Sequence, residues 1–433
     1  MKKAIMMICM LVLTLNVSGQ TTREEIRKDR RVSGGSFLAY PGPQQERLTP
    51  VPGGKKPFYI SHYGRHGSRH MTKYDDFKYV RNALELASQQ HVLTPLGYDV
   101  LARVARMEDE SHESLGELTA LGARQHGQIA ERMYHRFPEV FKGATNIEAK
   151  SSTSIRSIMS MNYALIALKG LNPRLNIIEK AALRDMHHLF HVDRELTAKS
   201  ASKENRKVYD DFCSKYPTWQ RLVSLLITDT AFVNRNFVGE RFGYYMFRIA
   251  SALQDSDLHD EMTFYDLFTE DEIYKNWKKE NAFWYLGYSF CPTSGGEQPY
   301  SQRFLLRDII EKADSCLQQP HPGITLRYGH DTALLPLICL LGINGYDLAT
   351  TDLDLLEEKG WLDYRAIPMA GNLQIVFYRK NLSDKDVLIK VLLNENEATL
   401  PIKTDVAPYY HWQDFRNHYL SLIDAYDAAH SDE

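Results

Sequence analysis

One short stretch of the chain, Arg65-His66-Gly67-Ser68-Arg69, places an imidazole between two guanidinium groups. An arginine presents a planar fork of N–H donors that matches the oxygen atoms of a phosphate. A histidine between two such forks can attack the anion that they hold, because its imidazole is largely neutral near neutral pH. The stretch therefore predicts phosphoryl transfer through a phosphohistidine. Gly64 and Gly67 predict a sharp turn directly after the apolar run Phe58–Ile60, which is typical of a strand end.

The same region allows two other interpretations. It can be a basic surface loop, or His62, His66 and His70, spaced four residues apart, can line one face of a helix and bind zinc. Gly64 and Gly67 disfavour a helix here. Because arginines can carry the charge of a phosphate, we expect no metal and no other cofactor.

A second candidate site lies far downstream, where an apolar run from Ile324 ends in Gly329 and is followed by His330 and Asp331. A helix with an apolar face then continues to Leu341. The carboxyl group of Asp331 can protonate a departing alkoxide and later act as a base toward water. It can also cap the helix, or do both.

A third segment, Ile147–Arg156, predicts a strand that leads into a hydroxyl-rich turn, with a helix from Ser157 to Leu168. The serine and threonine residues are good helix caps, and Arg156 can form a structural ion pair. A helix N-terminus beside an arginine is also an anion site.

Together these segments resemble the histidine acid phosphatases, which include histidine-type phytases and multiple inositol polyphosphate phosphatases. The family signature usually runs Arg-His-Gly-x-Arg-x-Pro, and this chain has Met71 at its last position. The lead-in Glu117–Gly122 resembles the family's Leu-Thr-x-x-Gly, and His330-Asp331 resembles its second motif. The run Val391–Ile402 resembles its closing hairpin, so the resemblance covers residues 58 to 402 in order.

The resemblance implies that His66 is the nucleophile and Asp331 the proton donor. Arg156 would complete a phosphate pocket to which Arg65, Arg69 and His330 also contribute. The implied fold is a phosphoglycerate-mutase-like α/β sandwich with a mainly helical inserted cap.

Signals for the substrate conflict. His330-Asp331-Thr332 is the form found in phytases and acid phosphatases, whereas Asn394-Glu395 resembles the inositol polyphosphate branch. We expect a small phosphorylated substrate, with inositol polyphosphates such as phytate first and sugar phosphates or other small phosphomonoesters second. A metal-dependent hydrolase and a non-catalytic phospho-ligand binding protein are rivals from other classes. Positive charge around the signature suits a polyanion and comes from Lys55, Lys56, His62, His70 and Lys73.

Helical spacing of apolar residues predicts helices over 77–87, 96–104 and 121–137. We also expect strands over 373–378 and 387–393. Residues 20–56 are rich in glycine and proline and predict surface loop. Short helical segments without βα alternation occupy 186–305. We therefore expect an α/β core from 20–185 and 306–433, with residues 186–305 as a helical insertion over the active site.

The first nineteen residues predict a secretory signal peptide, because Lys2 and Lys3 precede the apolar run Ala4–Leu15 and a small-residue site ends at Gly19. A membrane anchor is the alternative, but the run is short. We expect a secreted or periplasmic protein without an anchor after cleavage. The net charge of −3 and the lack of a long basic run argue against nucleic-acid binding. The remaining cysteines can form two disulfides or stay as buried thiols: Cys213, Cys291, Cys316 and Cys339.

Overall fold

The computed structural model describes residues 21–430, and a single mixed sheet runs through it. The spatial order of its strands is β3-β2-β4-β1-β5-β6-β7, and β8 pairs with β6. The four strands β1 to β4 run parallel, whereas β5 lies antiparallel to β1 and β6 antiparallel to β5. The strands span β1 Lys56–Arg65, β2 Asn146–Ser151, β3 Asn176–Ala181, β4 Gly323–Gly329, β5 Asn372–Arg379, β6 Leu388–Leu393, β7 Asn396–Glu397 and β8 Tyr409–His411.

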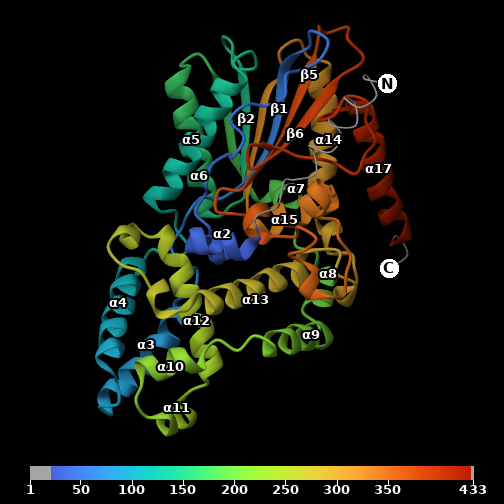
Figure 1. The fold of residues 1–433 in the computed structure, drawn as a ribbon. Helices are drawn as coiled ribbons and strands as arrows, with labels where there is room; N and C mark the ends of the chain where they lie inside the picture. The colour runs from blue at the N-terminus through green and yellow to red at the C-terminus, as the bar shows by residue number, and fades with distance from the viewer. Residues whose placement is uncertain (1–20, 431–433) are drawn as a thin grey trace, which may run out of the picture.

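Helices cover both faces of this sheet, as Figure 1 shows. On one face α5 and α6 pack in a core with residues such as Ile60 and Leu326. On the other face α14, α15 and α17 pack against Tyr59, Ile375 and their neighbours. The core strands β4, β5 and β6 are buried along their whole length, which is why they are apolar runs and not alternating ones. The predicted α/β sandwich is thus confirmed. These helices span α5 Ala120–Arg136, α6 Ile155–Leu171, α14 Arg303–Leu317, α15 Asp331–Leu340, α16 Asp363–Ala366 and α17 Trp412–Ala429.

A helical cap lies beyond the carboxyl ends of the parallel strands (Figure 1). Within the described residues, the segment between β3 and β4 contains helices and no strand. A second apolar core unites α10, α12 and α13 with α3 and α4. The division of the chain at residues 186 and 306 stays a prediction, and α3 and α4 pack with the cap. The cap and its neighbours span α3 Tyr74–Gln89, α4 Pro95–Ser111, α7 Met186–Leu189, α8 Arg194–Ser200, α9 Lys203–Ser214, α10 Gln220–Leu226, α11 Thr230–Asn236, α12 Gly239–Ala252, α13 Glu270–Tyr288 and the short 3₁₀ turn η3 Leu253–Asp255.

The prediction of surface loop for residues 20–56 is wrong at its start. Helix α2 spans Thr22–Lys28, and the 3₁₀ segment η1 spans Arg30–Phe37. The side chain of Thr21 caps α2 by accepting from the backbone N–H of Glu24. The end of η1, Ser33–Phe37, is buried between the cap and the sheet because Phe37 joins the second apolar core.

Disulfides are absent among the described cysteines, because all four remain free thiols and three of them are buried. The alternative of buried thiols is the correct one for Cys291, Cys316 and Cys339, which lie in the core beneath one face of the sheet. The predicted signal peptide, residues 1–19, lies outside the described residues. No helix within residues 21–430 has the length and apolar character that a membrane crossing needs.

Candidate active site

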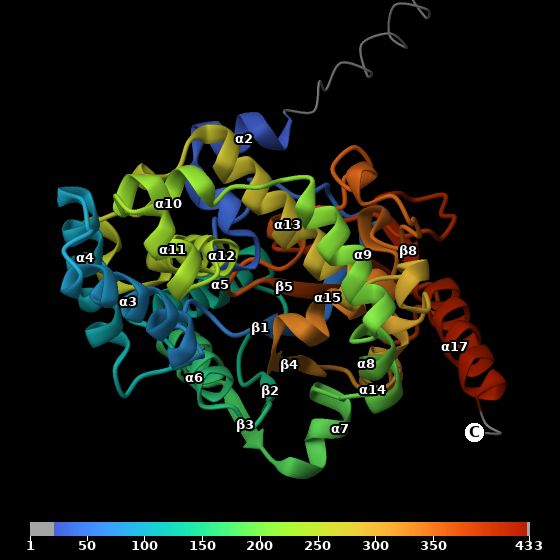
Figure 2. The same ribbon diagram turned by 90° about the horizontal axis from the view of Figure 1, so that it is seen from below.

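Three parallel strands end side by side, and each delivers a candidate residue to the same edge of the sheet. In the paired register Arg65 of β1 lies opposite Gly329 of β4, and Ser151 of β2 lies opposite Tyr328. His66, Ser152 and His330 are therefore the first residues after three neighbouring strands. Figure 2 shows these strand ends surrounded by α6, α7, α12 and α13. The carboxyl edge of a parallel sheet is the usual ligand site in α/β proteins.

The signature loop begins later than predicted, because strand β1 continues to Arg65. Strand β1 continues through Gly64, which pairs with Tyr328 on one side and Asn372 on the other, so Gly64 is not part of the turn. Gly67 is needed for close approach, because a Cβ there would lie 2.6 Å from the carbonyl oxygen of Gly122. Gly122 belongs to the Leu-Thr-x-x-Gly segment that starts α5, and it packs directly under the loop.

Met71, which stands where the family signature has proline, is buried at 1% exposure in the second apolar core. Its carbonyl oxygen accepts a hydrogen bond from the N–H of Gly116 at 2.9 Å. The methionine thus fixes the end of the loop by packing, where a proline would restrict the backbone.

His66 is buried and held in one orientation. Its backbone N–H donates to the carbonyl oxygen of Gly329 at 3.0 Å, and its Nδ1 lies 3.0 Å from the carbonyl oxygen of Gly67. A carbonyl only accepts, so Nδ1 carries the hydrogen and Nε2 keeps its lone pair. Burial, followed by the charges of Arg65 and Arg69, lowers the pKa of His66 well below its ordinary value. The imidazole is therefore neutral, as a nucleophile must be.

Three arginines surround this imidazole. Arg65 donates from Nη1 to the carbonyl oxygens of Ser36 and Ile367, both at 2.6 Å, and from Nη2 to Asp331 at 2.6 Å. Arg69 donates to its neighbour, the carbonyl oxygen of His70, at 3.0 Å. Among the described side chains, the buried Nε–H groups of Arg65, Arg69 and Arg156 have no hydrogen-bond partner within the protein. Burial lowers the pKa of Arg69 to about 10, so it remains charged at neutral pH.

His330 belongs to the second segment and contacts Ser152 and Arg156 of the third. Its ring centroid is 5.6 Å from that of His66, and its Nδ1 is 3.4 Å from Nη2 of Arg156. A guanidinium only donates, so Nδ1 is the acceptor and Nε2–H donates to the hydroxyl of Ser152 at 3.0 Å. Burial and the charge of Arg156 lower the pKa of His330 to about 4. Both ring nitrogens are engaged here, and a role in phosphate binding stays a prediction.

Asp331 is the first residue of α15, and His330 is the residue that precedes the helix as its N-cap. Its Oδ1 accepts from the N–H of Thr332 at 2.8 Å, and its Oδ2 pairs with Arg65. Burial by itself would raise the pKa of Asp331, but Arg65 and Arg69 outweigh it and hold that pKa below its ordinary value. The side chain is therefore a carboxylate in this arrangement.

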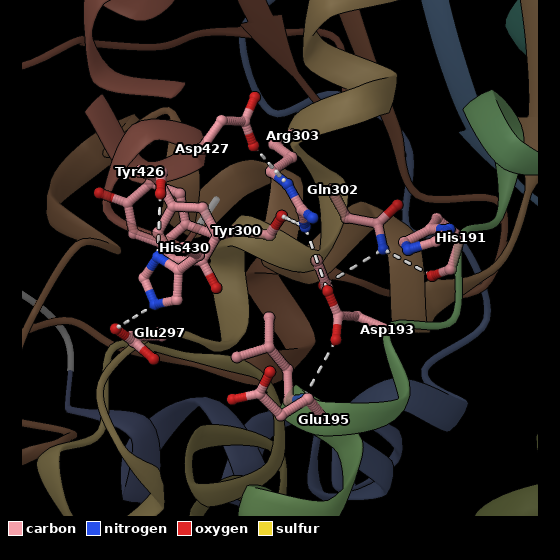
Figure 3. A network of polar contacts seen from close by, with 12 residues as sticks. His191, Asp193, Glu195, Glu297, Tyr300, Gln302, Arg303, Tyr426, Asp427 and His430 are labelled. Carbon is pink, nitrogen blue, oxygen red and sulfur yellow. Dashed lines mark hydrogen bonds and ion pairs between the residues drawn. The ribbon is translucent and has the colours of Figure 1, made fainter. Parts of the chain in front are cut away.

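Sequence reasoning missed several supporting groups. Ser152 holds His330, and Ser160 accepts from the N–H of Gly67 at 3.1 Å; both lie in or near the hydroxyl-rich segment that pointed to Arg156. Phe190 packs on the ring of His330 with centroids 4.5 Å apart. The segment that carries Phe190 is fixed at Asp193, whose carboxylate accepts from Arg303 at 3.1 Å (Figure 3).

Five residues were predicted to place positive charge around the signature, and the prediction is wrong for three of them. Lys55 and Lys56 lie at the opposite end of β1 from His66, and Lys55 pairs with Asp384 at 2.9 Å. His62 points into the core against Tyr328, where burial and its neighbour His126 lower its pKa to about 3. The positive charge is concentrated in the pocket. Within residues 21–430, no three side chains among His, Cys, Asp and Glu gather as metal ligands.

A cavity of about 800 Å³ opens in the cap between α9, α12 and α13. It lies near the strand ends, because Arg69 and Arg248 stack on the same ring of Phe37, at 5.6 and 5.2 Å from its centroid. Arg248, Glu280 and Tyr288 line it. Burial, and then the charge of Asp331, raises the pKa of Tyr288 to about 12. The lining also contains Arg206, Arg241 and Lys279.

Residues 64–394 match the histidine phosphatase superfamily (branch 2). A curated relative, multiple inositol polyphosphate phosphatase 1 of Gallus gallus, is 21% identical over 371 residues, which cover 79% of this chain and 79% of that protein. The protein of the same name from Homo sapiens is 24% identical over 150 residues, covering 33% of this chain and 30% of its own.

Solved structures show the same fold. Bifidobacterium longum multiple inositol polyphosphate phosphatase, in complex with inositol hexasulfate, superposes with a TM-score of 0.75 at 17% identity, covering 88% of this chain and 96% of that one. The phytase from D. castellii gives a TM-score of 0.63 at 15% identity, covering 91% and 85%.

Proposed function

The chain belongs to the histidine phosphatase superfamily (branch 2), and from this membership we propose that it hydrolyses inositol polyphosphates through a phosphohistidine formed on His66. As a member of this family it is a phosphoric monoester hydrolase. The substrate, the role of each residue and export from the cytoplasm are parts of the proposal.

One observation carries it: three arginines whose charges reach a neutral imidazole with a free lone pair, Arg65, Arg69 and Arg156, each have a buried Nε–H group with no partner among the described residues. A buried donor without a partner costs free energy, and an anion between the arginines removes that cost. When the buried carboxyl groups of Asp255 and Asp363, whose pKa values burial raises to about 7, are protonated, Arg65, Arg69 and Arg156 contribute three positive charges and Asp331 one negative charge, which leaves a balance of two. A phosphate monoester carries about two negative charges at neutral pH, so the two match.

In the first chemical step, Nε2 of His66 forms a bond to phosphorus as the bond between phosphorus and the leaving oxygen breaks. The arginines hold the equatorial oxygens, whose charge they stabilise in the transition state. The leaving alkoxide takes a proton from Asp331. That carboxylate is ionised beside Arg65 in the free protein. A bound phosphate competes for Arg65 and adds negative charge, which raises the pKa of Asp331 and prepares it as an acid.

In the second step, water attacks the phosphohistidine. Asp331, now ionised again, accepts a proton from the water as the bond from phosphorus to Nε2 breaks and inorganic phosphate leaves. His66 returns to its neutral form. The low pKa of its imidazole favours this return because the released nitrogen stays unprotonated.

Inositol polyphosphates are the proposed substrates because two kinds of support coincide. Relatives and structural neighbours named for these substrates align over most of the chain. The cap cavity beside the phosphate pocket is also lined in part by cationic side chains, Arg206, Arg241, Arg248 and Lys279. A substrate with several phosphates can place one at His66 and others toward these side chains.

Export is proposed from the N-terminal sequence alone, since those residues lie outside the described part of the chain. N-terminal sequencing of the protein recovered from the medium or periplasm tests it. A mature chain that begins at Gln20 supports export, and an intact Met1 in the cytoplasmic fraction contradicts it.

The function is tested by phosphate release from phytate and from glucose 6-phosphate, across acidic to neutral pH, with His66→Ala as the blank. A preference for phytate together with an inactive blank supports the proposal. A preference for the sugar phosphate rejects the substrate class and keeps the mechanism. Hydrolysis of neither compound favours a binding protein, and activity lost in EDTA rejects the metal-free mechanism.

A further inference from the structure

A buried aspartate of the cap touches the signature loop. Asp255 is the last residue of η3 and has no exposed surface. Its Oδ1 lies 2.5 Å from the hydroxyl of Ser68, the residue between Gly67 and Arg69. Its Oδ2 is buried and has no hydrogen-bond partner among the described residues. Burial of a carboxylate with one unsatisfied oxygen lowers the stability of the folded protein, which indicates a role other than stabilisation.

Ser68 is held on every polar atom. Its N–H donates to Oε1 of Gln125 at 2.9 Å, and Nε2 of Gln125 donates to its hydroxyl at 2.8 Å. Its carbonyl oxygen accepts from the backbone and the side chain of Thr119, at 3.0 and 3.1 Å. Because the amide of Gln125 can only donate to the hydroxyl, the hydroxyl hydrogen must point to Asp255. The direction of this chain of hydrogen bonds is therefore fixed.

The charged groups around Asp255 belong to the phosphate pocket. Burial raises the pKa of Asp255 to about 7, and the hydrogen bond from Ser68 and the charges of Arg69 and Arg65 act in the opposite direction. From the cap, Tyr265 lies close enough to feel the same carboxylate. Glu110 of α4 accepts hydrogen bonds from the hydroxyl of Ser256 and the N–H of Asp257, and its other oxygen lies 3.8 Å from Nδ1 of His70.

We propose that Asp255 is a positioning residue: through the hydroxyl of Ser68 it fixes the backbone that carries His66 and Arg69, and so couples the cap to anion binding. The inference rests on the proposed function, because it assumes that this loop binds a phosphate. It goes beyond that function because it assigns a positioning role to Asp255, which lies 187 residues after Ser68 in the sequence.

A change in the protonation of Asp255 alters the charge of the phosphate pocket, which a purely structural contact would not do. When its carboxyl ionises, the pocket's balance of positive charge falls from two to one, which weakens anion binding. Ionisation increases as the pH rises through about 7. A bound phosphate, which is negative, opposes that ionisation and so promotes proton uptake. Affinity for phosphate should therefore decline on the alkaline side, and Asp255→Asn should reduce that decline.

The test is a mutant cycle measured by calorimetric binding of inorganic phosphate at pH 5.5 and by kcat and KM for phytate. Ser68→Ala and Asp255→Ala each should weaken phosphate binding about tenfold, and the double variant also about tenfold, because the two residues act as one unit. Asp255→Asn keeps an acceptor for Ser68, so it should bind within about twofold of the wild type at pH 5.5. Between pH 6 and 8, KM should rise less for this variant than for the wild type.

Asp363 provides a matched control. It is also fully buried, burial raises its pKa to about 7, and its charge reaches Arg65. Its hydrogen-bond donors are Trp277 and the N–H of Tyr364, not Ser68. The effects of Asp363→Asn and Ser68→Ala should therefore multiply in the double variant.

A multiplicative effect of Ser68→Ala and Asp255→Ala, or wild-type phosphate binding by folded Asp255→Ala, overturns the inference. If Asp255→Ala does not fold, Ser68→Ala and Asp255→Asn decide: wild-type affinity in the first, or an unchanged alkaline decline in the second, overturns it. If the wild type binds phosphate but does not hydrolyse phytate, the proposed function fails and the cycle of phosphate affinities still decides on Asp255.

Discussion

Two arginine-containing regions within residues 21–430, one around Arg303 and one at the strand ends, differ in the partners of their guanidinium groups. Around Arg303, Nε donates to Asp427 at 2.9 Å, and Nη1 donates to Asp193 and to the carbonyl oxygen of Tyr300, both at 3.1 Å (Figure 3). At the strand ends, Arg65 pairs with the carboxylate of Asp331, and no ion pair to Arg69 or Arg156 is present among the described residues. The first region joins α8, α14 and α17, and the second keeps donors available for an anion from outside.

An unpartnered donor by itself does not mark a binding site. Nε of Arg103 is also buried without a partner, but two aspartates, Asp99 and Asp266, neutralise that arginine. The strand ends differ because the charges of three such arginines reach His66, and among the described residues the one ion pair that these arginines form is that of Arg65 with Asp331. Charge balance, and not the number of arginines, therefore separates an anion site from a structural network.

The largest effect should come from His66→Ala, which removes the nucleophile. We expect kcat for phytate to fall by about 10⁴-fold or more, because the arginines can still bind the substrate but cannot form the covalent intermediate. Acid-quenched labelling with ³²P-phytate should trap phosphoenzyme in the wild type and none in the variant. Equal labelling of the two proteins would assign the nucleophile to another residue.

Asp331→Asn should have the next largest effect, and the effect should depend on the leaving group. Removal of a general acid costs about 10²- to 10⁴-fold when the leaving group is a poor one, such as the alkoxide of an inositol phosphate. An aryl phosphate such as p-nitrophenyl phosphate needs little protonation, so its kcat should fall by about tenfold or less. Similar losses on both substrates would argue that Asp331 positions Arg65 and does not transfer the proton.

The pH dependence sharpens this prediction. The pKa of His66 lies well below its ordinary value, so protonation of the nucleophile should not reduce kcat between pH 7 and 5. Asp331 must be protonated in the complex, so kcat for phytate should fall as the pH rises through its pKa there. This alkaline decline should be absent from Asp331→Asn, and its persistence would point to a different acid.

Arg156→Lys and Arg303→Lys test the comparison most directly. Both substitutions keep the positive charge and lose the planar fork. At position 156 the fork faces the pocket, and we expect kcat/KM for phytate to fall by about 10- to 100-fold. At position 303 every guanidinium contact is internal, and kcat/KM should stay within about twofold of the wild type. A large loss of activity at position 303 would mean that the segment carrying Phe190 controls catalysis.

The sequence could predict which residues the structure brings together at the strand ends, because each follows a strand end that has a local signal; their catalytic roles stay a proposal. Gly329 ends a buried apolar run before His330, and the hydroxyl-rich turn before Arg156 follows β2. The parallel pairing of these strands brings the residues together, and the order of the motifs along the chain was enough to suggest it.

Long-range partners could not be predicted in the same way. Asp255 reaches Ser68 from a cap segment, and the carbonyl oxygen of Ser36 reaches Arg65 from η1. Neither segment carries a local pattern that names its partner, because the contact arises from tertiary packing. Helix α2 was missed for a different reason. Thr21, the acidic first turn and the basic last turn are ordinary helix signals, but the glycine- and proline-rich residues after it obscured them.

The smallest effect should be on stability, and it completes the comparison. Arg303 and Asp193 are mostly buried, whereas Asp427 is 40% exposed, so Arg303→Lys should lower the melting temperature by only about 1–3 °C. Inorganic phosphate should raise the melting temperature of the wild type and of Arg303→Lys equally, because a ligand that binds only the folded state stabilises it. The increase should be smaller for Arg156→Lys, whose pocket holds the anion less well. Differential scanning fluorimetry with and without phosphate measures both effects. If phosphate stabilised Arg156→Lys as much as Arg303→Lys, the unpartnered donor at position 156 would have no part in anion binding, and the distinction between the two arginine regions would rest on Arg65 and Arg69 alone.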